Sequence, residues 1–164
     1  MNPPRFGKHR GTVEANLDPL NQGRLLVKVP SVFGRGATNW AMPCVPYAGP
    51  DVGFLFLPPR GAHVWIEFEE GNTQKPIWSG CFWGPTEAMS LQPIPIRSVL
   101  KTPAFELTIT APPGAAAAAI VEIKHAAGHK ISMGPTGITI TNGLAKIELL
   151  GPAVKINNDG LEVT

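Results

Sequence analysis

A repeat of short apolar pairs runs through the second half of the chain and leaves few folds open to it. From Ile131 onward, pairs of apolar residues separated by one other residue recur at steps of seven to nine residues. Turn-forming sequences such as GPTG, TNG and NNDG lie between the pairs. A repeat this short has no room for a helix, so each unit is predicted to be one strand and one turn. The pairs are Ile131/Met133, Ile138/Ile140, Ile147/Leu149, Val154/Ile156 and Leu161/Val163.

Each predicted strand offers an apolar face that is only two residues long. Because side chains alternate between the two faces of a strand, polar residues such as Thr139 lie on the opposite face. Two earlier pairs, Leu107/Ile109 and Val121/Ile123, extend the pattern toward the N-terminus. The looser segment APPGAAAAA separates these two pairs.

Strands this narrow need both cover and edge partners. A single thin ladder would leave its apolar face in water and its outer hydrogen-bonding groups unpaired. A three-fold intertwined prism removes both problems, because the apolar pairs meet on the axis and each chain pairs with the next. A two-sheet monomer is the alternative, but its strands would normally be longer than this repeat allows. We therefore expect a homotrimer. The predicted trimer-core residues are Ile131, Met133, Ile138, Ile140, Ile147, Leu149, Val154, Ile156, Leu161 and Val163.

The first half of the chain, up to about Gly84, is predicted to form short strands separated by glycine and proline. Eighteen Gly and eighteen Pro leave hardly any stretch long enough for a helix of typical length. Segment 62–69 alternates most clearly, with Val64, Ile66 and Phe68 on one face. Short strands at roughly ten-residue intervals are typical of a small barrel or sandwich. The expected strands cover residues 10–17, 24–29, 38–47, 62–69 and 76–83.

A proline-rich stretch, 85–103, separates the two halves. Its prolines at positions 85, 93, 95 and 103 favour extended chain over a helix or a central strand. We therefore predict three parts in the chain. They are a base domain at 1–84, a connector at 85–103 and a needle at 104–164.

Three segments of the chain resemble the phage baseplate assembly protein V family and the related VgrG spike proteins of contractile injection systems. They are GKHRGTVEANLDPLNQGRLLVKVP at 7–30, the aromatic-, Gly- and Pro-containing block at 39–84, and KINNDGLEVT at 155–164. The middle block is the most specific of the three. The resemblance implies an all-β fold, in which an N-terminal OB-fold barrel is followed by a C-terminal intertwined triple-stranded β-helix in a homotrimer.

The same resemblance implies a structural spike and not an enzyme. Such a spike caps the tail tube at the baseplate hub and pierces the target cell envelope mechanically. A hub protein is therefore the expected partner at the OB-fold end, and the target membrane is contacted only transiently. Enzymatic members of the family carry extra domains, for which the connector at 85–103 is too short.

The C-terminal sequence bears on what sits at the tip. Some family members end in a tip that holds iron through His-x-His motifs, whereas this sequence ends in GLEVT without a late histidine. The resemblance then implies a separate PAAR-type tip protein on the last layer of the β-helix. The residues expected to dock it are Leu161, Glu162, Val163 and Thr164.

Charge and aromatic content bear on the alternative function, an OB-fold module that binds single-stranded nucleic acid or a glycan. The formal net charge is only +2, from fourteen basic and twelve acidic side chains, whereas nucleic-acid binders usually show a stronger basic bias. Aromatic residues of the first half could form a stacking platform, but we expect them to be barrel-core and interface residues. No nucleic-acid partner is therefore expected. The aromatic residues that could form such a platform are Trp40, Trp65, Trp78, Trp83, Phe54, Phe56 and Phe68.

No catalytic, cofactor-binding or metal-binding residue is predicted. His125 and His129 have the four-residue spacing of helical metal pairs, but they lie in a strand-and-turn region and are expected to face solvent or a turn. Cys44 and Cys81 lack a Cys-x-x-Cys motif, and we expect two reduced thiols buried as small apolar groups.

The sequence also bears on where the protein acts. The N-terminal sequence MNPPRFGKHRG lacks the apolar core of a signal peptide. Nowhere do about 18 apolar residues follow one another, as a membrane-spanning helix needs. We therefore expect assembly in the cytoplasm, incorporation into the baseplate of a phage virion or injection particle, and ejection toward the target cell.

Overall fold

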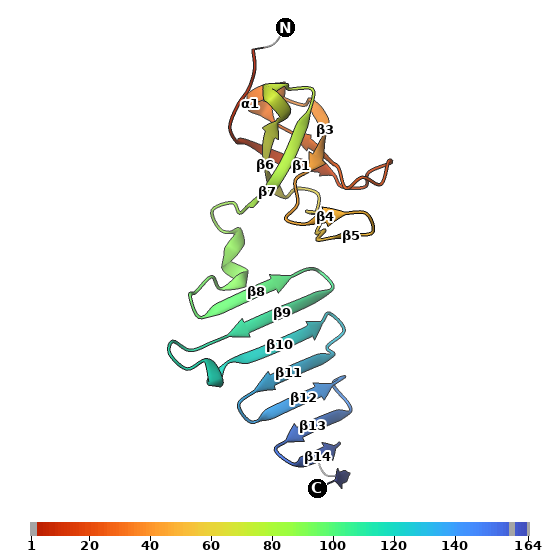
Figure 1. The fold of residues 1–164 in the computed structure, drawn as a ribbon, viewed down its shortest axis with the longest axis vertical. Helices are drawn as coiled ribbons and strands as arrows, with labels where there is room; N and C mark the ends of the chain where they lie inside the picture. Colours follow the sequence, from red (N-terminus) through yellow and green to blue (C-terminus); the bar gives the residue numbers. More distant parts are fainter. Residues whose placement is uncertain (1–2, 158–159, 164) are drawn as a thin grey trace. The chain divides into compact units, whose positions relative to one another are not determined.

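A computed structural model describes residues 3–157 and 160–163 of the chain. The chain divides into two compact units, Met1–Glu87 and Ala88–Thr164. Strands make up nearly all of the regular structure in both units, and the helical elements are only three to five residues long (Figure 1). The predicted all-β fold class is therefore confirmed.

The first unit is a closed five-stranded barrel, as expected for an OB-like domain. Its strands follow one another around the barrel in the order β1-β2-β3-β7-β6. All neighbouring pairs are antiparallel except β3 and β7, which close the barrel in parallel, with Met42 opposite Ile77. The strands are β1 (His9–Ala15), β2 (Leu25–Lys28), β3 (Thr38–Pro43), β6 (His63–Phe68) and β7 (Pro76–Phe82).

Alternating side chains of these strands form the barrel core. Strand β6 alternates as predicted, because Val64 and Ile66 are fully buried and Phe68 is nearly so. Trp78 also lies in the core, and its indole Nε1 donates a hydrogen bond to the carbonyl oxygen of Gly23 at 3.2 Å. The core residues are Val13, Leu25, Val27, Val29, Ala41, Val64, Ile66, Phe68 and Trp78.

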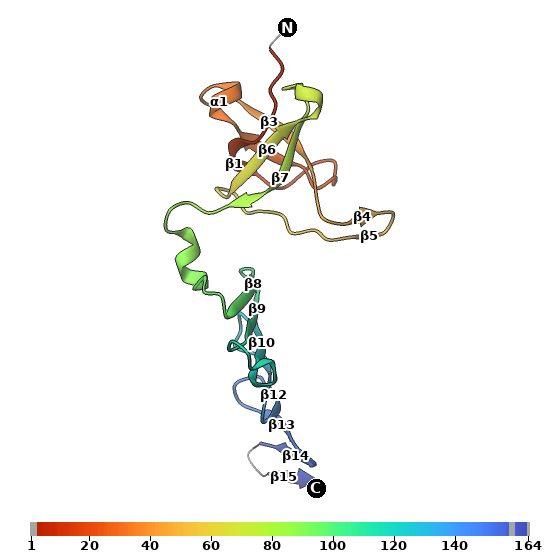
Figure 2. The same cartoon turned by 60° about the vertical axis from the view of Figure 1, so that its left-hand side comes forward.

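Short elements make the connections of the barrel. Helix α1 (Pro30–Phe33) begins with proline. The N–H groups of a first helical turn make no hydrogen bond within the helix, so a proline there costs none. Strands β4 (Ala48–Gly49) and β5 (Val52–Gly53) form a hairpin between β3 and β6. Figures 1 and 2 both show this hairpin projecting from the barrel. The 3-10 turn η1 (Glu69–Gly71) joins β6 to β7.

The carboxylate of Asp18 organises the turn between β1 and β2. This buried side chain accepts hydrogen bonds from the backbone N–H groups of Leu20, Gln22 and Arg24 at 3.0, 2.8 and 3.3 Å. The guanidinium of Arg24 adds an ion pair, with Nη2 2.7 Å from Oδ1 of Asp18. Arg24 and the backbone donors together hold the pKa of Asp18 well below its ordinary value. The turn is therefore built around an ionised carboxylate.

Replacing Asp18 by Asn should destabilise the barrel at neutral pH, because Arg24 and the backbone donors lose a charged acceptor. Since the folded-state pKa of Asp18 is depressed, its contribution is complete above the unfolded pKa of about 4 and is lost as pH falls below it. The wild type should therefore lose stability in acid more steeply than Asp18→Asn does.

Tryptophan fluorescence in urea tests this prediction, because all four tryptophans lie within residues 40–83 of the barrel unit. Glu70→Gln, which makes the same kind of change at an exposed turn position, is the control and should leave the urea midpoint unchanged. Equal midpoints for wild type and Asp18→Asn at pH 7 would contradict the prediction.

The second unit is an antiparallel sheet in which each strand pairs with the next one along the chain, from β8 to β15. Figure 1 shows the strands stacked in sequence, and Figure 2 shows the sheet as one thin layer. The 3-10 segments η2 (Glu87–Leu91) and η3 (Ala116–Ala118) precede β8 and β10. The strands are β8 (Arg97–Lys101), β9 (Phe105–Thr110), β10 (Ile120–His125), β11 (Lys130–Gly134), β12 (Gly137–Thr141), β13 (Lys146–Leu150), β14 (Ala153–Ile156) and β15 (Leu161–Val163).

Two features of this sheet differ from the expectations. Strand β8 lies inside the range 85–103 expected to be a connector, and it is paired with β9 over its whole length. The strands also pair within their own chain, whereas pairing with the next chain was expected. Short turns explain the second difference, because Gly143 and Gly151, at φ +93° and +58°, let the chain reverse at once into an adjacent strand.

Candidate trimerisation surface

The apolar pairs of the second unit form two continuous columns on one side of the sheet. Residues directly opposite each other in an antiparallel sheet point to the same face. Ile140, for example, lies opposite Ile131 on one side and opposite Ile147 on the other. We call the surface made by both columns the apolar face. The first column is Leu100, Leu107, Ile123, Ile131, Ile140, Ile147, Ile156 and Leu161, and the second is Ile109, Val121, Met133, Ile138, Leu149 and Val154.

The apolar face is uncovered in the single chain. Ile140 is 44% exposed, Ile147 41% and Leu149 40%. Among the described residues, the sheet is a single layer with no second sheet paired to it. Covering these half-exposed side chains would contribute roughly 1–2 kcal/mol for each of them. An apolar surface of this extent is typical of a protein–protein interface.

The opposite side of the sheet is polar and charged. Glu122 accepts from Lys124 at 3.0 Å and from Lys130 at 3.2 Å, and these cations lower the pKa of its carboxyl. Farther along the sheet, Glu148 pairs with Lys146 at 3.0 Å. Exposing ion pairs of this kind to water costs little free energy, whereas exposing the aliphatic side chains of the two columns is unfavourable. The two faces therefore differ as the alternation of the sequence predicts.

The described side chains of the predicted trimer core all lie on the apolar face. The backbone of Val163 pairs opposite Val154, while the Val163 side chain lies outside the described residues. Leu100 was missed, because the prolines around β8 argued for extended chain and the sequence RSVLK at 97–101 contains no pair of apolar residues two positions apart. The role of these residues in a trimer core stays a prediction.

The last strand, β15, carries the predicted tip-docking residues. It pairs with β14 on one side, and within the described part of the chain no strand pairs with its other side. Leu161 is 55% exposed. The side chains of Glu162 and Val163, and the whole of Thr164, lie outside the described residues. Docking of a tip protein here stays a prediction.

His125 and His129 lie at the turn between β10 and β11, as expected. Their rings are 5.6 Å apart, and the backbone N–H of His125 donates to the carbonyl oxygen of His129 at 2.8 Å. Across residues 3–157 and 160–163, no three His, Cys, Asp or Glu side chains come together in a way that could hold a metal ion. No helix in the described residues is long and apolar enough to cross a membrane.

The aromatic residues of the barrel divide between core and surface. Trp78 and Phe68 are core residues. Trp65 packs against Phe82 with ring centroids 4.5 Å apart, and the guanidinium of Arg10 lies 5.2 and 4.6 Å from the two centroids. Because a cation of the same chain already covers these rings, they make a poor platform for stacking bases.

Cys44 and Cys81 are free thiols, as predicted. The expectation that both are buried is wrong, because both are exposed. Cys44 lies just beyond the end of β3, and Cys81 lies near the end of β7, opposite Val64 and beside a register shift between Val64 and Ile66. Both thiols therefore lie where the regular strand pairing of the barrel ends or is interrupted, and they are exposed against the general tendency of free cysteine to be buried.

Comparison with known families agrees with this division of the chain. Residues 9–83 match the family model of the type VI secretion system/phage-baseplate injector OB domain. Residues 97–162 match the model of the phage baseplate V C-terminal trimerisation domain. Together the two matches cover most of the sequence, and the second begins at the first residue of β8. A search of curated proteins found no match.

Proposed function

Because the chain belongs to the family of phage-baseplate and type VI secretion injector proteins, we propose that three copies form the central spike of a contractile tail or injection machine. The continuous apolar face of a single-layer sheet is the observation that supports this proposal. Three such faces meet on a common axis and exclude water, while the charged faces point outward. Each chain then supplies one wall of a three-sided β-helix.

The direction of the hydrogen bonds suits a spike that transmits force. Figure 1 shows the strands of the second unit stacked one after another along the length of that unit. Hydrogen bonds between neighbouring strands, which lie about 4.8 Å apart, therefore run along its length. A load along this direction compresses strands that are already in hydrogen-bonded contact, so the needle resists shortening. The work comes from the contracting machine, and the spike contributes stiffness.

We place the barrel at the baseplate hub, where it caps the tube, and β15 at the end that meets a PAAR-type tip protein. In this proposal the spike is built in the cytoplasm, carried in the particle and driven through the target envelope, touching the membrane only in passage. Its task needs no catalytic residue and no cofactor.

The first test of this proposal is the mass of the purified protein. A single chain is 17.5 kDa, and light scattering at micromolar concentration should give three times that mass. The trimer should persist on dilution, because many half-exposed aliphatic side chains of each chain become covered together. A monomeric mass under these conditions would rule out the three-sided spike.

A further inference from the structure

The barrel carries an apolar arm that its own core does not use. The arm is residues 47–57, the segment that carries the β4–β5 hairpin. Its six large apolar side chains are between 38% and 59% exposed, although they follow one another closely in sequence. A cluster of this kind is typical of a contact surface. The six residues are Tyr47, Val52, Phe54, Leu55, Phe56 and Leu57.

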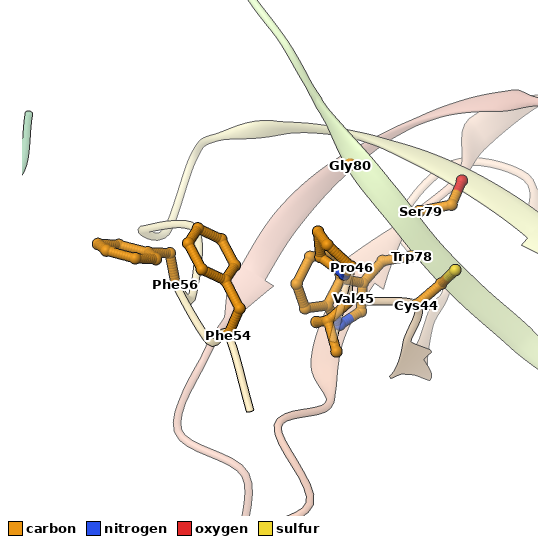
Figure 3. A pocket seen from close by; sticks show the side chains of 8 residues that line it. All are labelled: Cys44, Val45, Pro46, Phe54, Phe56, Trp78, Ser79 and Gly80. Carbon is orange, nitrogen blue, oxygen red and sulfur yellow. The ribbon is translucent and has the colours of Figure 1, made fainter. Parts of the chain in front are cut away.

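An apolar groove of about 400 Å³ lies where the arm leaves the barrel. Figure 3 shows Phe54 and Phe56 on one side of it and Val45, Pro46 and Trp78 on the other. The two phenylalanine rings are 5.0 Å apart. The groove can therefore accept an apolar segment between the arm and the barrel wall.

The trimer supplies such a segment at high local concentration. Residues 97–162 match a trimerisation domain, so residues 83–96 tether three barrels, with three arms and three grooves, in one particle. Tethering of this kind gives effective concentrations in about the millimolar range. At such an effective concentration even a weak apolar contact between barrels is formed in a substantial fraction of the trimers.

We propose that the arm of each barrel packs into the groove of the next barrel in the homotrimer. The contact joins two different surfaces, and a three-fold rotation closes it into a ring of three arms. This inference rests on the homotrimer of the proposed function. It adds a second contact among the three chains, made by the barrels and separate from the apolar face of the sheets.

Labelling of Cys44 with a maleimide tests the proposal in the full-length protein. Cys44 lines the groove and is exposed in the single chain, and Cys81→Ser leaves it as the only thiol. The reference is Leu17→Cys in a chain with both native cysteines replaced by Ser, because Leu17 is 85% exposed. Each labelling rate is divided by the rate of the same thiol in urea, where the chain is unfolded. If the arm occupies the groove nearly all the time, this normalised rate should be at least about tenfold lower for Cys44 than for the cysteine introduced by Leu17→Cys.

A change in the arm should remove this protection. Leu55→Asp, in the Cys81→Ser chain, is expected to bring Cys44 close to the reference rate, because a carboxylate is costly in an apolar groove. Leu20→Asp makes the same change at a surface leucine that is 61% exposed and outside the arm. This control should leave Cys44 protected. Both variants should stay trimeric by light scattering.

Three results would overturn the proposal. Cys44 could react at the reference rate in an intact trimer, or its protection could survive Leu55→Asp. Protection that arises only when the hub protein is added would assign the groove to the hub. In each of these cases the trimer and the proposed spike still stand, whereas a monomeric mass would overturn the spike itself.

Discussion

Ile140→Asp is expected to dissociate the homotrimer. Ile140 lies in the middle of the first apolar column, with Ile131 and Ile147 directly opposite on the neighbouring strands. In a three-sided prism one substitution places three carboxylates together in an apolar environment. Burying a charge without a partner costs on the order of 3–5 kcal/mol for each group, and mutual repulsion adds to this. Light scattering should show smaller species at micromolar concentration, and thermal unfolding should begin at a much lower temperature.

Thr139→Asp is the matched control, because it makes a similar change one residue away on the polar face. Thr139 lies opposite Ser132 and Glu148. The new carboxylate faces Glu148, which already pairs with Lys146 at 3.0 Å, so a cost below about 1 kcal/mol is expected. The variant should remain a trimer. Equal thermal stability for the two variants would show that the apolar face does not lie on the trimer axis.

Removal of residues 160–164 is expected to abolish capture of the cognate tip protein. The deletion takes away β15, whose outer edge has no partner strand in the described part of the chain, together with Leu161, which is 55% exposed. An apolar end with free strand edges is a docking surface. The trimer should survive, because the strands from β8 to β14 keep their apolar columns. A pull-down of the tip protein by full-length and truncated spikes measures the effect.

A single substitution separates loss of the docking surface from loss of chain length. Leu161→Asp should weaken capture strongly, because it places a charge on the exposed apolar end. Leu144→Asp makes the same change at a turn residue that is 98% exposed and lies between β12 and β13. That control should capture the tip protein as the wild type does. Undiminished capture by the truncated spike would place the contact elsewhere on the protein.

Most predictions about the apolar face came from the alternation of apolar and polar residues along each short strand. Ile138 and Ile140 are two residues apart in a short strand, so they must share a face whichever strand lies beside them. The same reasoning assigned Val64 and Ile66 to the barrel core, where both are fully buried. These predictions depend only on the geometry of an extended backbone, and for that reason they did not need a tertiary structure.

Predictions from the sequence failed for features that depend on which distant segments of the chain contact each other. Residues 97–101 show no apolar alternation and the prolines around them argued for a connector, so only pairing with β9 shows that they form a strand. The exposure of Cys44 likewise depends on where β3 ends and on which wall of the barrel lies beside it.

Sequence alone determined the all-β class, the division into barrel and repeat, and the facing of the apolar pairs, because periodicity and turn residues act over a few neighbouring positions. Only the tertiary structure decided that the repeat forms a meander within one chain, that β3 and β7 close the barrel, and that the arm at 47–57 is exposed. Those features depend on contacts between residues far apart in the chain, and on side chains that no neighbour in sequence can cover.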